Sequence, residues 1–204
     1  MVVAVTGPER DPKYFSLHQH VELRDSRLGG MGLFATAGIK EGEVIWSDDT
    51  YNADKYLHTL PEIKSWPSER QREFMHYAYQ IEEETFAGVG SLEIVRSDAS
   101  NYMNHSCDPN CWFLTEDPAR MLARRAMKAG EEITFDYATS ETTDFRYQIS
   151  GWESCLCGSK NCRGKLLGSD YQRPDVRKRY EGHFMPYVQR LIERGAAAGE
   201  EDKL

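Results

Sequence analysis

Three cysteines near the C-terminal end of the chain lie close enough in sequence to hold one metal ion. Cys155, Cys157 and Cys162 fall within eight residues, and Gly158 and Gly164 allow the loop to fold around a point. Cysteines separated by one residue rarely pair with each other, because disulfide geometry is demanding. A tetrahedral zinc ion needs four ligands, so the pattern predicts a zinc site completed from elsewhere in the chain. Three unrelated free thiols are the alternative.

The segment 101–110, Asn-Tyr-Met-Asn-His-Ser-Cys-Asp-Pro-Asn, is the second group of reactive side chains. It collects amide, imidazole, hydroxyl and thiol groups, and no amphipathic period explains it. Cys107 and Cys111 are the candidates for the fourth zinc ligand, with His105 less favoured. The chain has five cysteines and its first residues lack a signal-peptide pattern. Both features predict an intracellular metal site rather than a disulfide framework.

A glycine-rich stretch, Gly30-Met31-Gly32, lies in the first third of the chain. Together with Ala35 it matches a dinucleotide-binding fingerprint, but that fingerprint must open a helix. Two more glycines follow within ten residues with no helical stripe between them, so we reject that interpretation. We expect a loop whose missing side chains let the backbone approach a ligand. A plain turn is the alternative.

The segment 132–137, Glu-Ile-Thr-Phe-Asp-Tyr, predicts a strand with Phe135 and Tyr137 on one face. An aromatic residue in a strand usually serves core packing. The four segments taken together indicate a role for Phe135 and Tyr137 other than core packing. In order along the chain, Gly-x-Gly-Leu-Phe-Ala, Asn-His-Ser-Cys-Asp-Pro-Asn, Glu-Glu-Ile-Thr-Phe-Asp-Tyr and Cys-x-Cys-Gly-x3-Cys-Arg-Gly resemble a SET-domain protein lysine methyltransferase with its cysteine-rich post-SET segment. The resemblance covers roughly residues 20 to 167.

The resemblance implies a mainly β fold of small curved sheets with short helices, a post-SET zinc loop and C-terminal helices. It also implies a pseudoknot-like threaded crossing at the Asn-His-Ser-Cys segment, an exception to the rule against threading. It implies S-adenosylmethionine as cofactor, bound by Gly30, Met31 and Gly32 at its methionine part, by Tyr102, Asn104 and His105 in the pocket, and by Leu166 over the adenine.

The resemblance further implies that Cys107 joins Cys155, Cys157 and Cys162 around one structural zinc ion, which leaves Cys111 as a spare thiol. Tyr137 and Phe135 are the implied catalytic residues. The reaction is attack by a neutral lysine amine on the methyl group of a sulfonium, and no acid–base triad is required. A free lysine has a pKa of ~10.4, so desolvation beside the sulfonium has to lower it. Phenylalanine at 135, in place of tyrosine, implies di- or trimethylation.

Two departures from the family pattern limit what can be transferred. Many relatives carry Arg-Phe before the Asn-His motif, where this chain has Asn101-Tyr102. Many also place a channel tyrosine after the early strand, where this chain reads Ile-Trp-Ser-Asp-Asp over residues 45–49, with Tyr51 further on. One wall of the lysine channel is therefore unassigned. The acidic pair at 48–49 and the acidic cluster at 82–84 are candidates for attracting a basic substrate peptide. The alternative is that both are solvated surface residues.

Composition and periodicity frame these motifs. The chain has 204 residues, 40% hydrophobic, and a net charge of -8. Such a charge disfavours direct nucleic-acid binding and attracts cationic peptides, and no apolar window is long enough for a membrane span. We expect an N-terminal segment over 1–18, a SET domain over 19–140 with a helical insert at 55–90, a post-SET zinc-binding segment over 141–168, a C-terminal helical extension over 169–195 and a disordered tail over 196–204.

Short strands are predicted at 20–24, 43–46, 121–123 and 132–135 from weak alternation between glycine turns. Two short helices are predicted between residues 57 and 81, with a break at Pro67. Apolar residues at helical spacing predict a helical C-terminal part that Pro186 splits into two segments and Gly195 ends. The basic run at 177–179 is either a solvated helix face or a nuclear signal.

The leading hypothesis is a protein-lysine N-methyltransferase, with a basic histone tail as the substrate class that the resemblance implies. The alternatives are a methyltransferase of a non-histone protein lysine and a weakly catalytic SET module that binds a lysine-containing peptide. The protein is expected in the nucleus if the substrate is a histone and otherwise in the cytoplasm. The oligomeric state is left open.

Overall fold

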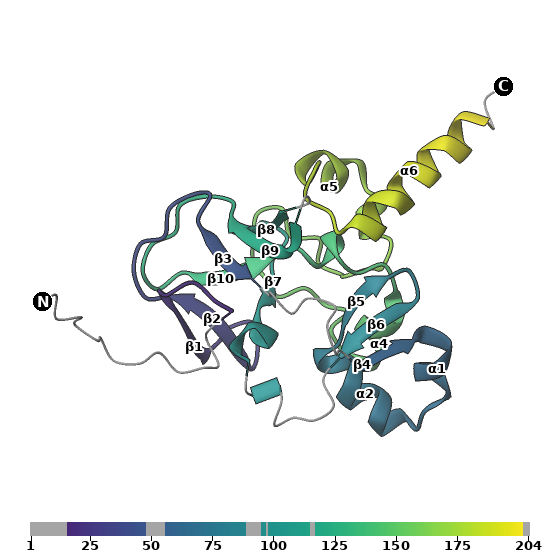
Figure 1. Cartoon of the computed structure of the whole chain (residues 1–204), viewed down its shortest axis with the longest axis horizontal. Helices are drawn as coiled ribbons and strands as arrows, with labels where there is room; N and C mark the ends of the chain where they lie inside the picture. Colours follow the sequence, from purple (N-terminus) through teal and green to yellow (C-terminus); the bar gives the residue numbers. More distant parts are fainter. Residues whose placement is uncertain (1–15, 48–55, 89–94, 97, 115–116, 202–204) are drawn as a thin grey trace, which may run out of the picture.

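The computed structural model describes residues 16–47, 56–88, 95–96, 98–114 and 117–201, and these form three small sheets with short helices (Figure 1). The first sheet has the order β1 (Val21–Asp25), β2 (Met31–Ala35), β10 (Glu132–Phe135), β7 (Asn104–His105). The second has the order β3 (Val44–Ser47), β9 (Asp117–Ala123), β8 (Cys111–Leu114). The third has the order β4 (Tyr56–Thr59), β6 (Thr85–Gly88), β5 (Tyr79–Glu82). The mainly β fold expected from the sequence is confirmed.

The first sheet brings the two motif segments side by side. β10 pairs with β7 in parallel, so that Phe135 faces His105 in the register. β10 also pairs antiparallel with β2, which places Ile133 opposite Leu33. Strand β10 ends at Phe135, and Tyr137 begins the short 3-10 helix η3 (Tyr137–Thr139). The prediction that Phe135 and Tyr137 share one strand face is therefore wrong. The side chain of Asp136 caps η3 by accepting the Ala138 amide, and this turns the chain out of the sheet.

The insert at 55–90 contains the two predicted helices, α1 (Leu60–Ser65) and α2 (Ser68–Tyr77), separated at Pro67. The Thr59 hydroxyl caps α1 by accepting the Glu62 amide. The insert expected to be helical also contains strands β4, β5 and β6. The apolar spacing predicts helix up to residue 81, but the backbone is already extended at Ala78. The last residues of the predicted helix therefore form strand β5. The helices pack on this sheet around Ile63, Met75 and Phe86.

The C-terminal part contains α4 (Asp144–Ser150), η4 (Asp170–Gln172), α5 (Pro174–Arg179) and α6 (Pro186–Glu201). The break at Pro186 is confirmed. The prediction that the helix ends at Gly195 is wrong, because α6 continues to Glu201. The disordered tail predicted from residue 196 is therefore helical over residues 196–201. One glycine costs a helix only about 1 kcal/mol, and three alanines follow it. Figure 1 shows α6 projecting from the body of the molecule; residues 202–204 lie outside the described part.

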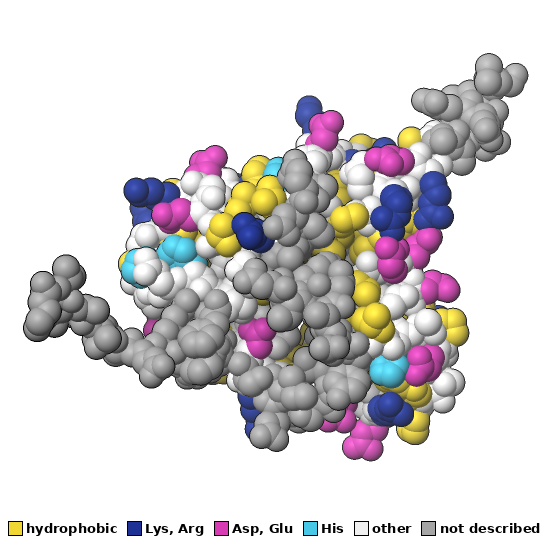
Figure 2. Space-filling model, in the orientation of Figure 1, with side chains coloured by type: hydrophobic (Ala, Val, Ile, Leu, Met, Phe, Trp, Pro, Cys, Tyr) yellow, Lys and Arg dark blue, Asp and Glu magenta, His cyan; other side chains and the backbone are white. Residues whose placement is uncertain are grey.

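The acidic cluster expected to be a solvated edge is exposed and ion-paired. Arg190 lies 2.6 Å from Glu82, and Arg194 lies 2.7 Å from Glu83, so that α6 contacts β5 and the turn that follows it. Acidic and basic side chains lie beside one another on the face shown in Figure 2. Such exposed pairs contribute about 0–1 kcal/mol each. The two ion pairs therefore add little to the free energy of folding, and their main effect is to hold α6 beside β5.

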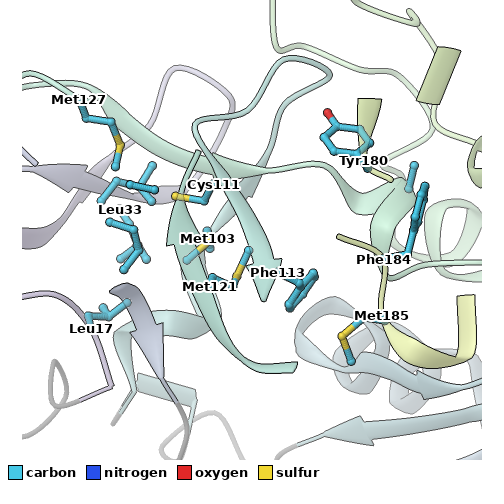
Figure 3. Packing of buried hydrophobic residues seen from close by; sticks show 14 of the residues in the cluster. Leu17, Leu33, Met103, Cys111, Phe113, Met121, Met127, Tyr180, Phe184 and Met185 are labelled. Carbon is cyan, nitrogen blue, oxygen red and sulfur yellow. The ribbon is translucent and has the colours of Figure 1, made fainter. Parts of the chain in front are cut away.

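A single large apolar cluster connects the first two sheets with the C-terminal helices. Leu33, Ile45 and Ile133 are 0% exposed at its centre. Figure 3 shows Leu17 at one side of this cluster and Tyr180 and Phe184 at the other. Leu17 is buried and forms a bridge with Trp46, so residues 16–18 of the predicted N-terminal segment belong to the domain. The remainder of that segment, residues 1–15, lies outside the described residues.

Candidate active site and metal centre

A cavity of about 600 Å³ lies where the first sheet, the insert and the cysteine loop meet. This is within the range of small-molecule sites, about 300–1,000 Å³. Almost all of the predicted cofactor-binding and catalytic residues line it: Gly30, Met31, Tyr102, Asn104, His105, Phe135, Tyr137 and Leu166. The segments that carry these residues are up to 136 positions apart, from Gly30 to Leu166. The fold therefore brings these residues together around one cavity.

Gly32 is the one predicted cofactor residue that does not line the cavity. A Cβ built at Gly32 would lie 2.8 Å from Asn104 Nδ2 and would overlap the Glu132 carboxylate. Asn104 Nδ2 donates to the Met31 carbonyl at 3.0 Å and to Glu132 Oε1 at 2.8 Å. Gly32 thus leaves room for Asn104 to reach across β2 and fix the wall of the cavity. Gly30, at φ +64, takes the backbone conformation that only glycine adopts readily.

Four sulfur atoms converge beside this cavity. The Sγ atoms of Cys107, Cys155, Cys157 and Cys162 all lie within 4.8 Å of one another. A tetrahedral zinc ion with Zn–S bonds of ~2.3 Å separates its sulfurs by ~3.8 Å. The donor set and its spacing fit a structural zinc ion.

Cys111 is excluded from this set by its position. It is 1% exposed, and Figure 3 shows it among the side chains of Leu33, Met103 and Met121 in the core. Burial raises the pKa of the Cys111 thiol, so it stays protonated and packs as a small apolar side chain. The structure places Cys107 with the other three cysteines, as the family resemblance implies.

His105 connects the cysteine cluster to the segment that carries Tyr137. Its Nδ1 accepts the backbone N–H of Tyr137 at 3.1 Å, so its Nε2 carries the proton. That Nε2 lies 3.3 Å from Cys107 Sγ. The Cys155 thiol, His105 and the Arg163 amide lower the pKa of Cys107 to about 3. His105 therefore donates a hydrogen bond to the Cys107 sulfur and is not part of the four-cysteine cluster.

A buried arginine fastens the cysteine loop to the sheet. Arg163 follows Cys162 and forms two hydrogen bonds with Asp136, at 2.6 and 2.7 Å. Its Nε donates to Asp170 at 2.9 Å. Burial acts to raise the pKa of Asp136, but Arg163 outweighs it and the pKa is lowered. Sequence reasoning missed this triad, although Arg163 beside the last cysteine and Asp136 beside Tyr137 were visible in the motifs.

Tyr137 is held between these parts. Its hydroxyl donates to the Met103 carbonyl at 3.2 Å, and its ring lies 5.0 Å from that of Phe135 and 5.1 Å from that of His105. Burial raises the pKa of Tyr137 to about 12. The phenol therefore stays protonated at neutral pH. Its oxygen keeps lone pairs that can accept a contact from a group in the cavity.

The wall that the sequence left unassigned is aromatic. Trp46, Tyr79 and Trp152 line the cavity from β3, β5 and the turn after α4. Tyr51 and the acidic pair at 48–49 lie outside the described residues. Sequence reasoning missed Tyr79 because its spacing predicted a core helix, and Trp152 because it precedes the first cysteine of the loop without a motif of its own.

The comparisons with known proteins agree with this arrangement. The SET domain model matches residues 30–138, which is more than half of the 204 residues. The chain belongs to the SET-domain family. The match ends one residue after Tyr137, so it includes the glycine loop and the Asn-His motif but not the cysteine loop. The recognition made from the motifs is confirmed at the level of the family.

Similar proteins carry histone methyltransferase names. The chain is 27% identical over 150 residues to a histone-lysine N-methyltransferase, H3 lysine-4 specific, of Mycosarcoma maydis, covering 71% of this chain and 10% of that protein. It is 30% identical over 151 residues to histone-lysine N-methyltransferase set-2 of Caenorhabditis elegans, covering 72% and 9%. An H3 lysine-36 specific enzyme of Chaetomium globosum is 29% identical over 139 residues, covering 63% and 15%. The chain thus matches about a tenth of the first two relatives' length.

Among the described residues, no helix combines the length and apolar character needed to cross a bilayer.

Proposed function

We propose that this chain is an S-adenosylmethionine-dependent protein-lysine N-methyltransferase that acts on a histone tail. The observation that carries the proposal is one cavity in which Asn104, Tyr137 and the cysteine loop meet in a SET-domain chain. The names of the relatives, two of them H3 specific, support a histone as the substrate class. The net charge of -8 favours a basic peptide. A histone substrate implies a nuclear location.

Cofactor binding is assigned to the side of the cavity formed by Gly30, Met31, Tyr102, Asn104 and His105. Leu166 closes this side from the cysteine loop and is 5% exposed. Bound S-adenosylmethionine supplies a methyl group activated by the sulfonium. The chain contributes backbone groups at the glycine loop and a fixed amide at Asn104, which is held by Met31 and Glu132.

The cysteine cluster is assigned one structural zinc ion. Cys155, Cys157 and Cys162 would hold it together with Cys107, which follows the Asn-His motif by two residues. Such a site attaches the loop to the domain, and Leu166 lies four residues beyond the last ligand. Zinc binding thereby positions the part of the loop that covers the cofactor side of the cavity.

Lysine alkylation needs a neutral amine aligned with the methyl group. The aromatic walls at Trp46, Tyr79 and Trp152 remove water from the channel and lower the pKa of an entering lysine. The Tyr137 oxygen accepts a contact from the amine or the methyl group, since its proton is given to Met103. Alignment of this kind supplies up to ~7–11 kcal/mol of the barrier reduction. Phe135 adds no hydroxyl beside Tyr137, so we assign di- or trimethylation.

The test is transfer of labelled methyl groups from S-adenosylmethionine to core histones and to a whole-cell extract. The full chain is compared with Tyr137→Phe, which removes one hydroxyl, and with Tyr171→Phe, which makes the same change in η4 outside the cavity lining. We expect label on one histone that is lost in Tyr137→Phe and kept in Tyr171→Phe. Label only in the extract identifies a non-histone substrate. No label in either, with cofactor bound, contradicts the proposal and leaves a silent binding module.

A further inference from the structure

Glu132 of β10 connects the two segments that form the cofactor side of the cavity. Its Oε1 accepts a hydrogen bond from Asn104 Nδ2 at 2.8 Å and another from Ser26 Oγ at 2.7 Å. The three side chains meet over Gly32, where a Cβ would lie 2.8 Å from Asn104 Nδ2 and 3.0 Å from Ser26 Cβ. One carboxylate oxygen therefore links the Asn-His motif to the start of the glycine loop.

Ser26 is itself held in place by the loop that it begins. Its N–H donates to the Gly30 carbonyl at 2.8 Å, and its carbonyl accepts the Gly29 N–H at 3.2 Å. Its hydroxyl oxygen also accepts the Leu28 N–H at 2.9 Å. Because Ser26 is fixed by three contacts of its own, its hydrogen bond restricts the end of the Glu132 side chain.

The contacts of Asn104 determine which way its side-chain amide faces. Nδ2 donates to the Met31 carbonyl at 3.0 Å as well as to Glu132, so both of its hydrogens are used. The reverse orientation would place Oδ1 against the Met31 carbonyl, and two oxygens that can only accept would then face each other. The hydrogen bonds therefore direct Oδ1 away from Met31 and Glu132.

Asn104 Oδ1 is an accessible acceptor. Within the described part of the chain no group donates to it, yet it is not one of the buried side-chain atoms that lack a partner. Asn104 is partly exposed and lines the cavity next to Met31. An accessible acceptor on a residue of the cavity wall suits a hydrogen-bond donor of a bound molecule.

We propose that Glu132 is a positioning residue for the cofactor, and that it holds the Asn104 amide so that Oδ1 accepts a hydrogen bond from the α-ammonium group of S-adenosylmethionine. This inference rests on the proposed function, which assigns Met31 and Asn104 to the cofactor side of the cavity. The methionine part of the cofactor carries an ammonium and a carboxylate, and only the ammonium donates hydrogen bonds. The Asn104 oxygen therefore favours the ammonium and disfavours the carboxylate.

Calorimetric titration of the full chain with two ligands tests this assignment. One ligand is S-adenosylhomocysteine, which has the α-ammonium group, and the other is its analogue with hydrogen in place of the α-amino group. We expect Glu132→Met to lower the affinity for S-adenosylhomocysteine by about 10-fold, because a hydrogen bond to a charged group is misplaced. The affinity for the analogue should stay the same, since the analogue has no ammonium to donate to Asn104.

Two further variants separate positioning from charge and from general destabilisation. Glu132→Gln keeps an acceptor oxygen for Asn104 and should keep the preference for S-adenosylhomocysteine. Glu131→Met makes the methionine change one position earlier, in a surface pair with Arg125, and should bind both ligands as the wild type does. Circular dichroism and zinc content show whether each variant is folded.

Three results would overturn the inference. The first is wild-type binding of both ligands by Glu132→Met, and the second is an equal loss for both, which indicates a structural role. The third is a loss of the preference in Glu132→Gln as well, which indicates attraction by charge. If Glu132→Met does not fold, Ser26→Ala frees the carboxylate from one side and must reduce the preference by about 3-fold. An unchanged preference in Ser26→Ala then contradicts the inference. A wild-type chain that binds neither S-adenosylmethionine nor S-adenosylhomocysteine refutes the proposed function instead, so the two failures are distinguishable.

Discussion

Replacement of Arg163 by alanine tests whether the buried triad holds the cysteine loop on the domain. The side chains of Arg163, Asp136 and Asp170 are 3%, 0% and 5% exposed. Removing one partner of a buried ion pair leaves an uncompensated charge and costs about 3–5 kcal/mol. We expect Arg163→Ala to lower the free energy of unfolding by that amount at pH 7. In a chain of this length the loss corresponds to a Tm decrease of about 6–20 °C.

The pH dependence of this effect has a definite sign. In the wild type the pKa of Asp136 is below its ordinary value of 3.8, so its contribution to stability is present above that value and is lost as the pH falls through the lowered pKa. Without Arg163, burial is opposed by His105 and the Ala138 amide but no longer by the guanidinium, so the pKa of Asp136 rises from its wild-type value. Protonation then relieves the buried charge. The difference in unfolding free energy between the two proteins should therefore become smaller as the pH falls from 7 toward 4.

Urea unfolding of the full chain with zinc in the buffer measures both quantities. The matched control is Arg125→Ala, since the Arg125–Glu131 pair is exposed, with side chains 51% and 30% accessible. That change should cost about 0–1 kcal/mol. A loss for Arg163→Ala no larger than for Arg125→Ala, or one that does not change with pH, would refute the reasoning.

Three further predictions concern the walls of the site. Gly32→Ala should destabilise the fold by about 1–3 kcal/mol, because its Cβ would overlap Asn104 and Glu132, whereas Gly38→Ala has its nearest atom at 3.9 Å and should be neutral by thermal unfolding. Metal analysis should find one zinc per chain, lost in Cys157→Ser and kept in Cys111→Ser; a zinc-free Cys111→Ser would contradict the ligand set. Phe135→Tyr should stop at monomethyl-lysine by mass spectrometry with substrate in excess, and unchanged di- or trimethyl product would argue against the assigned role.

The sequence predicts three of the four clustered cysteines from their local spacing, and the resemblance to the SET family supplies the residues assigned to the cofactor. Cys155, Cys157 and Cys162 restrict one loop, and the Asn-His motif requires a parallel strand partner to bring it beside Tyr137. The residues alone leave Cys107 and Cys111 open, the family resemblance implies Cys107, and the fold places Cys107 in the cluster. The two differ by four residues, yet one faces the cysteine loop and the other packs against Leu33 in the core.

Burial and strand pairing that depend on contacts between residues far apart in the sequence leave no local sequence pattern. Glu141 and Arg146 look like ordinary surface charges until the fold buries them against the cavity. Apolar spacing of three and four residues predicts helix near residue 80, but pairing with β6 turns Tyr79 and its neighbours into a strand. Helix α6 continues past Gly195 because one glycine costs a helix only about 1 kcal/mol and the alanines that follow are the best helix formers. In each case tertiary packing or neighbouring propensity outweighs the local signal.

The most direct measurement of the proposed chemistry is the mass of core histones after incubation with the full chain and S-adenosylmethionine, with fragmentation to locate the change. Methylation of a lysine side chain is the expected result, and it should be absent with Tyr137→Phe. Unmodified histones and extract proteins, in the presence of bound cofactor and zinc, would contradict a methyltransferase role for this cavity.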